Sequence, residues 1–200
     1  MDKEKLLEQL KALADNFVPG ISEDVIAKAL SFSRFKSFAK GELIARTGEK
    51  ADSAGLVICG VVRSFYVDDN GNDITQHFAS EGNWCMDSGM LGFSELQSDW
   101  EAILDSTVMI FDVRAMRELI YSDEKLKDIW IGLLESAIRY KIYREHGFLI
   151  ESAKERYISF TRNFPTLAER IQQRYVATFL GIKPESLSRI RSALKEKTIN

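Results

Sequence analysis

Short apolar runs separated by polar turns dominate the first part of the chain. Each run is short enough for a β-strand, and Gly, Asp or Asn commonly lies between one run and the next. The runs span residues 32–38, 43–45, 54–58, 61–67, 74–78, 101–104 and 107–113. The clearest turn signal is Asp69-Asn70-Gly71, which is typical of a hairpin. Many short strands joined by regular turns predict a β-barrel or jelly roll.

Helical spacing replaces this pattern on both sides of the predicted barrel. Two short amphipathic helices are predicted before it, over 3–14 and 22–30. After it, apolar residues recur at helical spacing over about 115–149, a stretch without Pro. The stripe on this long helix comprises Leu126, Trp130, Leu133, Ala137 and Tyr140. So broad a stripe needs a partner, either the barrel or the same helix of a second chain.

The last part of the chain has helical spacing interrupted by turn signals. One helix is predicted over 152–163, because Pro165 disfavours helix in the residue before it, and a short one over 167–171. The next helix ends just before Gly181, which suits a left-handed cap, and Pro184 suits the first turn of another helix. Two helices joined by so tight a turn predict a helix-turn-helix.

The helix that begins at Pro184 has two different faces. At about 100° per residue, Leu187, Ile190 and Leu194 fall together on one side, which predicts burial. The start of this helix and its other face carry side chains that could bind DNA: Lys183, Glu185, Ser186, Ser188, Arg189, Arg191 and Ser192. In a major groove, Arg can bond guanine, Glu can accept from cytosine, and Ser can bond a base or a phosphate. The alternative is an ordinary surface helix with a polar outer face.

Charge divides the chain in the same place. Residues 1–150 carry 17 Lys and Arg against 25 Asp and Glu, a balance of −8. Residues 151–200 carry 10 against 5, a balance of +5. An acidic body with a basic end favours polyanion binding at that end, although a solvated basic surface would have the same composition.

Nothing in the sequence indicates a membrane segment or an export signal. No run is long and apolar enough to span a bilayer, and the first residues are charged and amphipathic. We therefore expect a cytoplasmic protein without a membrane partner.

Side chains for metal or catalytic chemistry are few and scattered. His77 and His146 lie far apart, and Cys59 and Cys85 are too few for a disulfide framework or an iron–sulfur cluster. We therefore expect no catalytic residue, no metal site and no cofactor. Two alternatives stay open. One is a cupin-like small-molecule-binding or metalloenzyme barrel with a helical tail that does not bind DNA, and the other is haem ligation by His77 or Cys85.

The order of barrel, long helix and helix-turn-helix resembles the Crp–Fnr family of bacterial transcription regulators. Residues 38–44 followed by 47–49 are similar to the family's opening strand pair, and 59–65 with 69–71 look like its central hairpin. Residues 180–182 and 184–189 match the helix-turn-helix of one subgroup. The resemblance covers nearly the whole chain and implies an α+β fold. It implies three parts: a cyclic-nucleotide-binding-like β-barrel sensor domain at 1–120, a dimerisation helix at 121–149, and a helix-turn-helix DNA-binding domain at 150–200.

The resemblance also implies partners. By position, Glu185, Ser188 and Arg189 would read bases, whereas Pro184 replaces an Arg of the best-known members, so that one base contact is lost or moved. Only residues 195–200 follow the recognition helix, so the β-hairpin wing of many members is not expected. The implied partners are double-stranded DNA with an inverted-repeat operator, a second copy of the chain, and RNA polymerase.

Residues 82–104 occupy the position of the family's phosphate-binding cassette. In members that bind cyclic nucleotides, a Glu there holds the ribose hydroxyl and an Arg pairs with the cyclic phosphate. Asp87 could replace the Glu, but no Lys or Arg lies between Arg63 and Arg114, and a buried anion needs a partner. We therefore expect a small effector other than cyclic AMP. Its candidate site comprises Arg63, Trp84, Met86, Asp87 and Trp100, unless these side chains only fill the barrel core.

Overall fold

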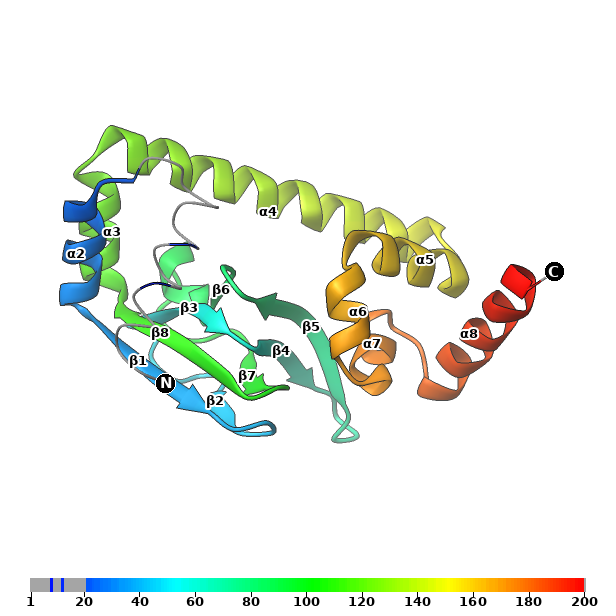
Figure 1. Cartoon of the computed structure of the whole chain (residues 1–200). Coiled ribbons are helices and arrows are strands. Elements are labelled where there is room, and N and C mark those ends of the chain that lie inside the picture. Colours follow the sequence, from blue (N-terminus) through cyan, green and yellow to red (C-terminus); the bar gives the residue numbers. More distant parts are fainter. Residues whose placement is uncertain (1–7, 9–11, 13–20, 200) are drawn as a thin grey trace. The chain divides into compact units, whose positions relative to one another are not determined.

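The computed structural model describes residues 8, 12 and 21–199, which fall into two compact units (Figure 1). The first unit comprises Met1–Phe65 and His77–Leu133, and the second comprises Tyr66–Gln76 and Leu134–Asn200. Residues 8 and 12 are helical, but the rest of the helix predicted over 3–14 lies outside the described residues. Two separate stretches of the chain therefore build each unit.

Two four-stranded sheets form the β-structure. Their strand orders are β1-β8-β3-β6 and β2-β7-β4-β5. The strands are β1 (Ser33–Phe38), β2 (Leu43–Ala45), β3 (Ser53–Cys59), β4 (Val61–Val67), β5 (Asp73–Ser80), β6 (Trp84–Cys85), β7 (Asp99–Ala102) and β8 (Ser106–Asp112). β8 pairs antiparallel with β1 and β3, and β7 pairs antiparallel with β2 and β4. The predicted barrel of short strands is confirmed. The two-residue strand β6 was not predicted, and β7 begins and ends two residues before the run predicted at 101–104.

The middle of β8, residues 108–111, is an unbroken apolar run because it is buried on both faces. Val108 and Ile110 point into the core between the two sheets, which Val57, Val62, Cys85 and Trp100 also fill. Met109 and Phe111 point to the opposite face and belong to a second apolar cluster. Successive side chains of a strand alternate between faces, so a strand buried on both sides is apolar at every position.

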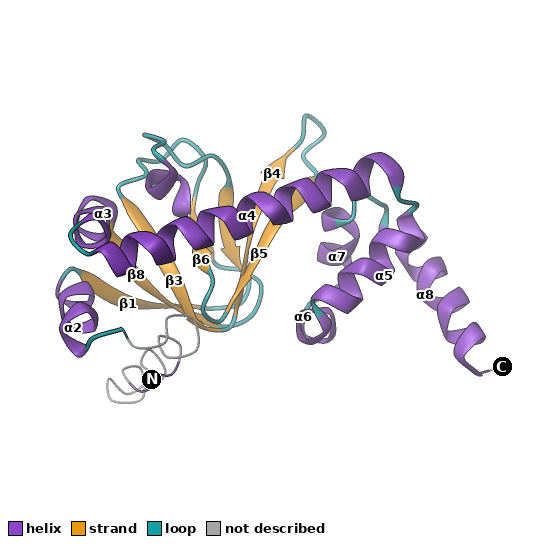
Figure 2. Ribbon diagram, turned by 90° about the horizontal axis from the view of Figure 1, so that it is seen from above, coloured by secondary structure: helices purple, strands orange, loops and turns teal. Residues whose placement is uncertain are grey.

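Helices cover the second apolar cluster (Figure 2). They are α2 (Glu23–Ser31), α3 (Val113–Tyr121) and the first part of α4 (Glu124–Ile150), with the 3-10 helix η1 (Asp87–Leu91) beside α3 and β3. Leu119 and Ile120 of α3 and Leu126 of α4 are buried there. The first unit therefore has two apolar layers, one inside the barrel and one under the helices.

The prediction of one helix over 115–149 is wrong, because α3 ends at Tyr121 and α4 begins at Glu124. Ser122 caps α3, and its hydroxyl donates to the carbonyl of Leu119 at 2.8 Å. The Asp123 carboxylate then accepts a hydrogen bond from the amide of Leu126 at 3.0 Å. An Asp at this position satisfies an amide that has no partner within the helix, so it starts a new one.

The residues of the apolar stripe predicted on the long helix lie in different environments. Leu126 and Trp130 pack against the second apolar cluster of the first unit. Tyr140 meets Phe164 edge-on, with ring centroids 5.9 Å apart. Leu133 is 40% exposed. Other large apolar residues of α4 are more exposed than these: Ile131, Ile138, Ile142, Leu149 and Ile150.

The second unit contains the helices predicted for the C-terminal part. They are α5 (Ala153–Asn163), α6 (Pro165–Arg170), α7 (Gln173–Phe179) and α8 (Pro184–Ile199). A capping box begins α5, in which the Ser152 hydroxyl accepts from the amide of Glu155 and the Glu155 carboxylate accepts from the amide of Ser152. The Phe160 ring packs against Phe164 and Phe179, with centroids 5.7 and 5.5 Å apart.

Candidate nucleic-acid interface and effector site

The turn between α7 and α8 has a left-handed residue at its centre. Leu180 caps α7, and Gly181 follows with a φ of +67°. The amide of Ile182 then bonds back to the carbonyl of Ala177 at 3.0 Å. A β-carbon at position 181 would lie 3.0 Å from Cε1 of Phe148. Both the backbone conformation and the close neighbour therefore favour glycine, as predicted.

The helix α8 turns its predicted polar face to solvent. Leu187 is buried, and Ile190 and Leu194 are half-buried, so the apolar face predicted from spacing is the inner one. Five of the seven predicted DNA-binding residues are exposed, namely Lys183, Glu185, Ser188, Arg189 and Ser192. Ser186 and Arg191 are half-buried. All seven therefore lie in the turn before α8 or between its first residue and its middle, and their contacts with DNA stay a prediction.

A polar groove of about 340 Å³ lies between α7 and α8. Ser188, Arg191, Ser192 and Lys195 of α8 line it, together with Gln173 at the start of α7. The buried Oε1 atom of Gln173 has no hydrogen-bond partner. Two cationic side chains in a polar groove suit an anionic group such as a phosphate. Gln173 was not among the predicted residues, because no local pattern shows that it lies beside α8.

Arg63, the one cationic residue of the predicted effector site, is already paired. It lies opposite Glu101 in the β4–β7 ladder, and its Nε donates to Glu101 Oε1 at 2.6 Å. The guanidinium lies 4.5 Å from the centroid of the Phe65 ring, and the side chain is only 2% exposed. Alternation along β7 puts Glu101 on the face opposite to Trp100, which points into the core. An anion in the barrel would therefore have to draw Arg63 out of this ion pair.

The other predicted effector residues lie in three different places. Met86 and Trp100 are buried in the core between the sheets. Trp84 belongs instead to the second apolar cluster and packs against Trp130 of α4, with ring centroids 5.5 Å apart. Asp87 is half-buried at the start of η1. The burial of Met86 and Trp100 supports core packing, the alternative that the sequence left open.

The barrel core contains three further features. Met86 has a φ of +54°, the one positive φ outside glycine among the described residues. The buried Nε1 atom of Trp100 has no hydrogen-bond partner. Burial raises the pKa of the Cys85 thiol, which is therefore neutral. Strained backbone and unpaired buried donors often occur at functional sites.

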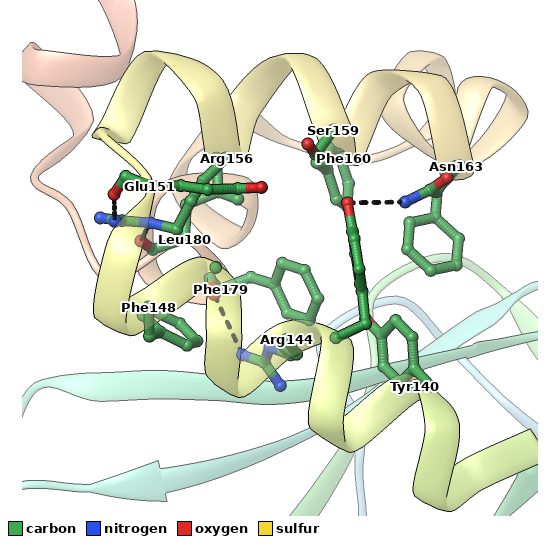
Figure 3. A pocket seen from close by; sticks show the side chains of 13 residues that line it. Tyr140, Arg144, Phe148, Glu151, Arg156, Ser159, Phe160, Asn163, Phe179 and Leu180 are labelled. Atoms are coloured by element: carbon green, nitrogen blue, oxygen red, sulfur yellow. Dashed lines mark hydrogen bonds between the residues drawn. The ribbon is translucent and has the colours of Figure 1, made fainter.

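A second crevice, of about 40 Å³, lies between α4, α5 and α7 (Figure 3). Arg144 and Phe148 from α4, Arg156 from α5 and Phe179 from α7 line it with other side chains. Arg156 donates to the carbonyls of Glu151 and Leu180 at 2.6 and 3.1 Å. A crevice of this volume holds only a few water molecules, so it is a packing feature of the helices.

Metal-binding side chains do not gather in the part of the chain that the structure describes. Across residues 8, 12 and 21–199, no three of the His, Cys, Asp and Glu side chains are placed to share a metal ion. His77 is half-buried on β5, and His146 is exposed on α4. Within the same residues, no helix combines the length and the apolar character that a membrane span requires.

The fold is similar to those of several known proteins. Residues 35–123, from β1 through α3, match the family described as cyclic nucleotide-binding domain. FixK2 from Bradyrhizobium japonicum superposes with a TM-score of 0.74, at 21% identity over 84% of this chain and 86% of that chain. A transcriptional regulator of the Crp/Fnr family from Eubacterium rectale superposes with a TM-score of 0.68, at 16% identity over 91% of this chain and 88% of that chain. The chain has the Crp/Fnr fold.

A third structure with the Crp/Fnr fold is CLP from Xanthomonas campestris, described as a c-di-GMP responsive global regulator. It superposes with a TM-score of 0.71, at 13% identity over 88% of this chain and 93% of that chain. A search of the curated proteins finds no significant match to this sequence. The cyclic nucleotide-binding match ends with α3, so the likeness of α4 to α8 to the Crp/Fnr fold rests on the solved structures.

Proposed function

We propose that this chain is a dimeric DNA-binding transcription regulator of the Crp–Fnr type. The observation that carries the proposal is the exposed polar face of α8, which follows a left-handed turn and lies beside a basic groove. In this assignment the sensor domain comprises residues 1–120, the dimerisation helix residues 121–149, and the DNA-binding domain residues 150–200. The protein would act in the cytoplasm and bind an inverted-repeat operator. RNA polymerase would be its further protein partner.

Within this proposal the residues of α8 have different roles. Arg189 is exposed and near the start of the helix, where side chains reach base edges first, so it would bond guanine. Glu185 and Ser188 would contact neighbouring bases from the same face. The DNA backbone or its nearest bases would be contacted by the remaining predicted residues, Lys183, Ser186, Arg191 and Ser192. Arg191 lines the groove that suits a phosphate, so its contact would not depend on sequence.

Selection of bound duplexes from a randomised DNA pool tests the proposal. The wild-type protein should enrich an inverted repeat whose half-sites are centred about 34 Å apart. Arg189→Ala should lose about 1–3 kcal/mol of discrimination at one base pair of each half-site. Arg191→Ala, the matched control, should weaken all duplexes alike and reduce the salt dependence of binding. The proposal is contradicted if wild type enriches no repeat or if Arg189→Ala keeps full selectivity.

We further propose that a small effector other than cyclic AMP controls the sensor domain. No Lys or Arg lies between Arg63 and Arg114, and Arg63 is held by Glu101. A neutral ligand would accept a hydrogen bond from the unpaired Nε1 of Trp100 and contact the strained backbone at Met86. Trp84 and Asp87 lie in the same segment of the chain as Met86. Calorimetric titration should show no saturable binding of cyclic AMP or cyclic GMP. Micromolar binding of either nucleotide would overturn this claim. Arg63→Met would then test whether Arg63 is the cation that pairs with the cyclic phosphate.

A further inference from the structure

The tip of the β4–β5 hairpin, Tyr66–Gln76, belongs to the second unit, although both strands continue from it into the barrel. Thr75 lies in this tip and is only 1% exposed. Its amide and its hydroxyl both lie within hydrogen-bond distance of the Thr178 hydroxyl of α7, at 3.3 and 2.8 Å. The two threonines are 103 positions apart in the sequence. Strand β5 is therefore bonded directly to the first helix of the helix-turn-helix.

The hydrogen atoms at this contact can be assigned. A threonine hydroxyl has one hydrogen to donate and two lone pairs to accept. The Thr178 hydroxyl donates to the carbonyl of Tyr175 at 3.2 Å, so it can accept from both the amide and the hydroxyl of Thr75. Its hydrogen-bonding capacity is then fully used. Replacing Thr178 by an apolar residue of the same shape would remove the acceptor of two buried donors.

Arg144 of α4 joins the same two elements. Its Nη1 donates to the carbonyl of Gln76 in β5. Its Nη2 donates to the carbonyl of Phe179 at 3.0 Å (Figure 3). The guanidinium lies 4.0 Å from the centroid of the Phe179 ring. A cation at the end of α7 also satisfies a helix carbonyl that has no partner within the helix. Burial lowers the pKa of Arg144.

We propose that this hairpin–α7 contact, formed by Thr75, Gln76, Arg144, Thr178 and Phe179, couples the sensor barrel to operator binding. The inference rests on the proposed function. Helix α7 spans only Gln173–Phe179, and so short a helix depends on tertiary contacts for its position. Helix α8 packs on α7 and follows it directly through the turn at Gly181. A shift of β4 and β5 in the barrel would therefore reach α8 through hydrogen bonds to α7.

Hydrogen exchange tests the contact without DNA. Thr178→Val keeps the shape of the side chain and removes the hydroxyl, and Thr75→Val removes the partner hydroxyl. Each should raise the exchange rates of the amides of residues 66–76 by roughly 2- to 10-fold, and the double variant should show less than the product of the two effects. Thr161→Val is the control, because that hydroxyl bonds only within α5, to Ile158. Unchanged exchange in Thr178→Val would overturn the contact.

Operator binding tests the coupling. The probe is the duplex that the wild-type protein enriches from the randomised pool. Thr75→Val and Thr178→Val should each weaken its binding by roughly 2- to 10-fold, although neither side chain lies on α8. Thr161→Val should bind as wild type does. Unchanged or tighter binding by both variants overturns the coupling. Failure of the wild type to enrich any duplex removes the proposed function itself, while the exchange result still stands for the contact.

Discussion

At the scale of single residues, one glycine sets the geometry between the two helices of the proposed DNA-binding motif. Gly181 has a φ of +67°, a conformation that costs residues with a β-carbon. The nearest atom to an added β-carbon is Cε1 of Phe148, at 3.0 Å. Backbone strain and crowding therefore act in the same direction at this position.

Gly181→Ala should destabilise the second unit by about 1–2 kcal/mol, because alanine pays the cost of the left-handed conformation. Chemical denaturation followed by circular dichroism measures the loss. Gly132→Ala is the matched control, since Gly132 lies within α4 and an added β-carbon would meet nothing within 4 Å. Alanine favours helix there, so stability should be unchanged or rise by up to about 1 kcal/mol. Equal effects of the two substitutions would contradict this account.

At the scale of elements, α5 begins with reciprocal hydrogen bonds. The Glu155 carboxylate accepts from the amide and the hydroxyl of Ser152, at 2.8 and 2.7 Å. These bonds lower the pKa of Glu155 from its ordinary value of 4.5. A carboxyl group with a lowered pKa stabilises the fold above its ordinary pKa, and this contribution is lost as the pH falls.

Ser152→Ala should therefore destabilise the protein by about 1 kcal/mol at neutral pH, because the cap and its reciprocal bonds are lost. The difference from wild type should shrink as the pH falls well below 4.5, where Glu155 becomes protonated. Urea denaturation at neutral and acidic pH measures both quantities. Ser159→Ala, within the same helix, is the control and should cost less. A difference that grows towards acidic pH would refute the assignment to Glu155.

At the scale of the whole molecule, α4 leaves apolar side chains uncovered. Ile131, Ile138, Ile142 and Leu149 are 52%, 57%, 61% and 74% exposed. They follow one another at intervals of seven, four and seven residues, which places them along one face of the helix. A row of this kind favours a second copy of the same helix as its partner.

Ile138→Asp should convert the proposed dimer to a folded monomer, because a charge replaces an exposed apolar side chain in the middle of this row. Sedimentation at micromolar concentration measures the mass, and circular dichroism checks the fold. Leu133→Asp should act in the same direction, since Leu133 is 40% exposed. Leu91→Asp is the control, because Leu91 is 50% exposed but lies in η1 and should leave the mass unchanged. A wild-type monomer would rule the dimer out.

Much of the fold followed from local patterns. The apolar runs at 43–45 and 61–67 coincide with β2 and β4, because strand spacing and turn residues are local signals. Strand β6 was not predicted, since two residues carry no periodicity. The left-handed Met86 had no signal at all, because methionine is not a residue that favours this conformation.

The sequence by itself determined most of the strands, the helix-turn-helix and the two faces of α8, because periodicity and a glycine turn act over a few neighbouring residues. Only the tertiary structure decided which apolar side chains of α4 stay exposed, and that Glu101 already holds Arg63. It alone brought Thr75 to Thr178. These contacts join segments that are far apart in the chain, and their partners are chosen by packing, which no local pattern encodes.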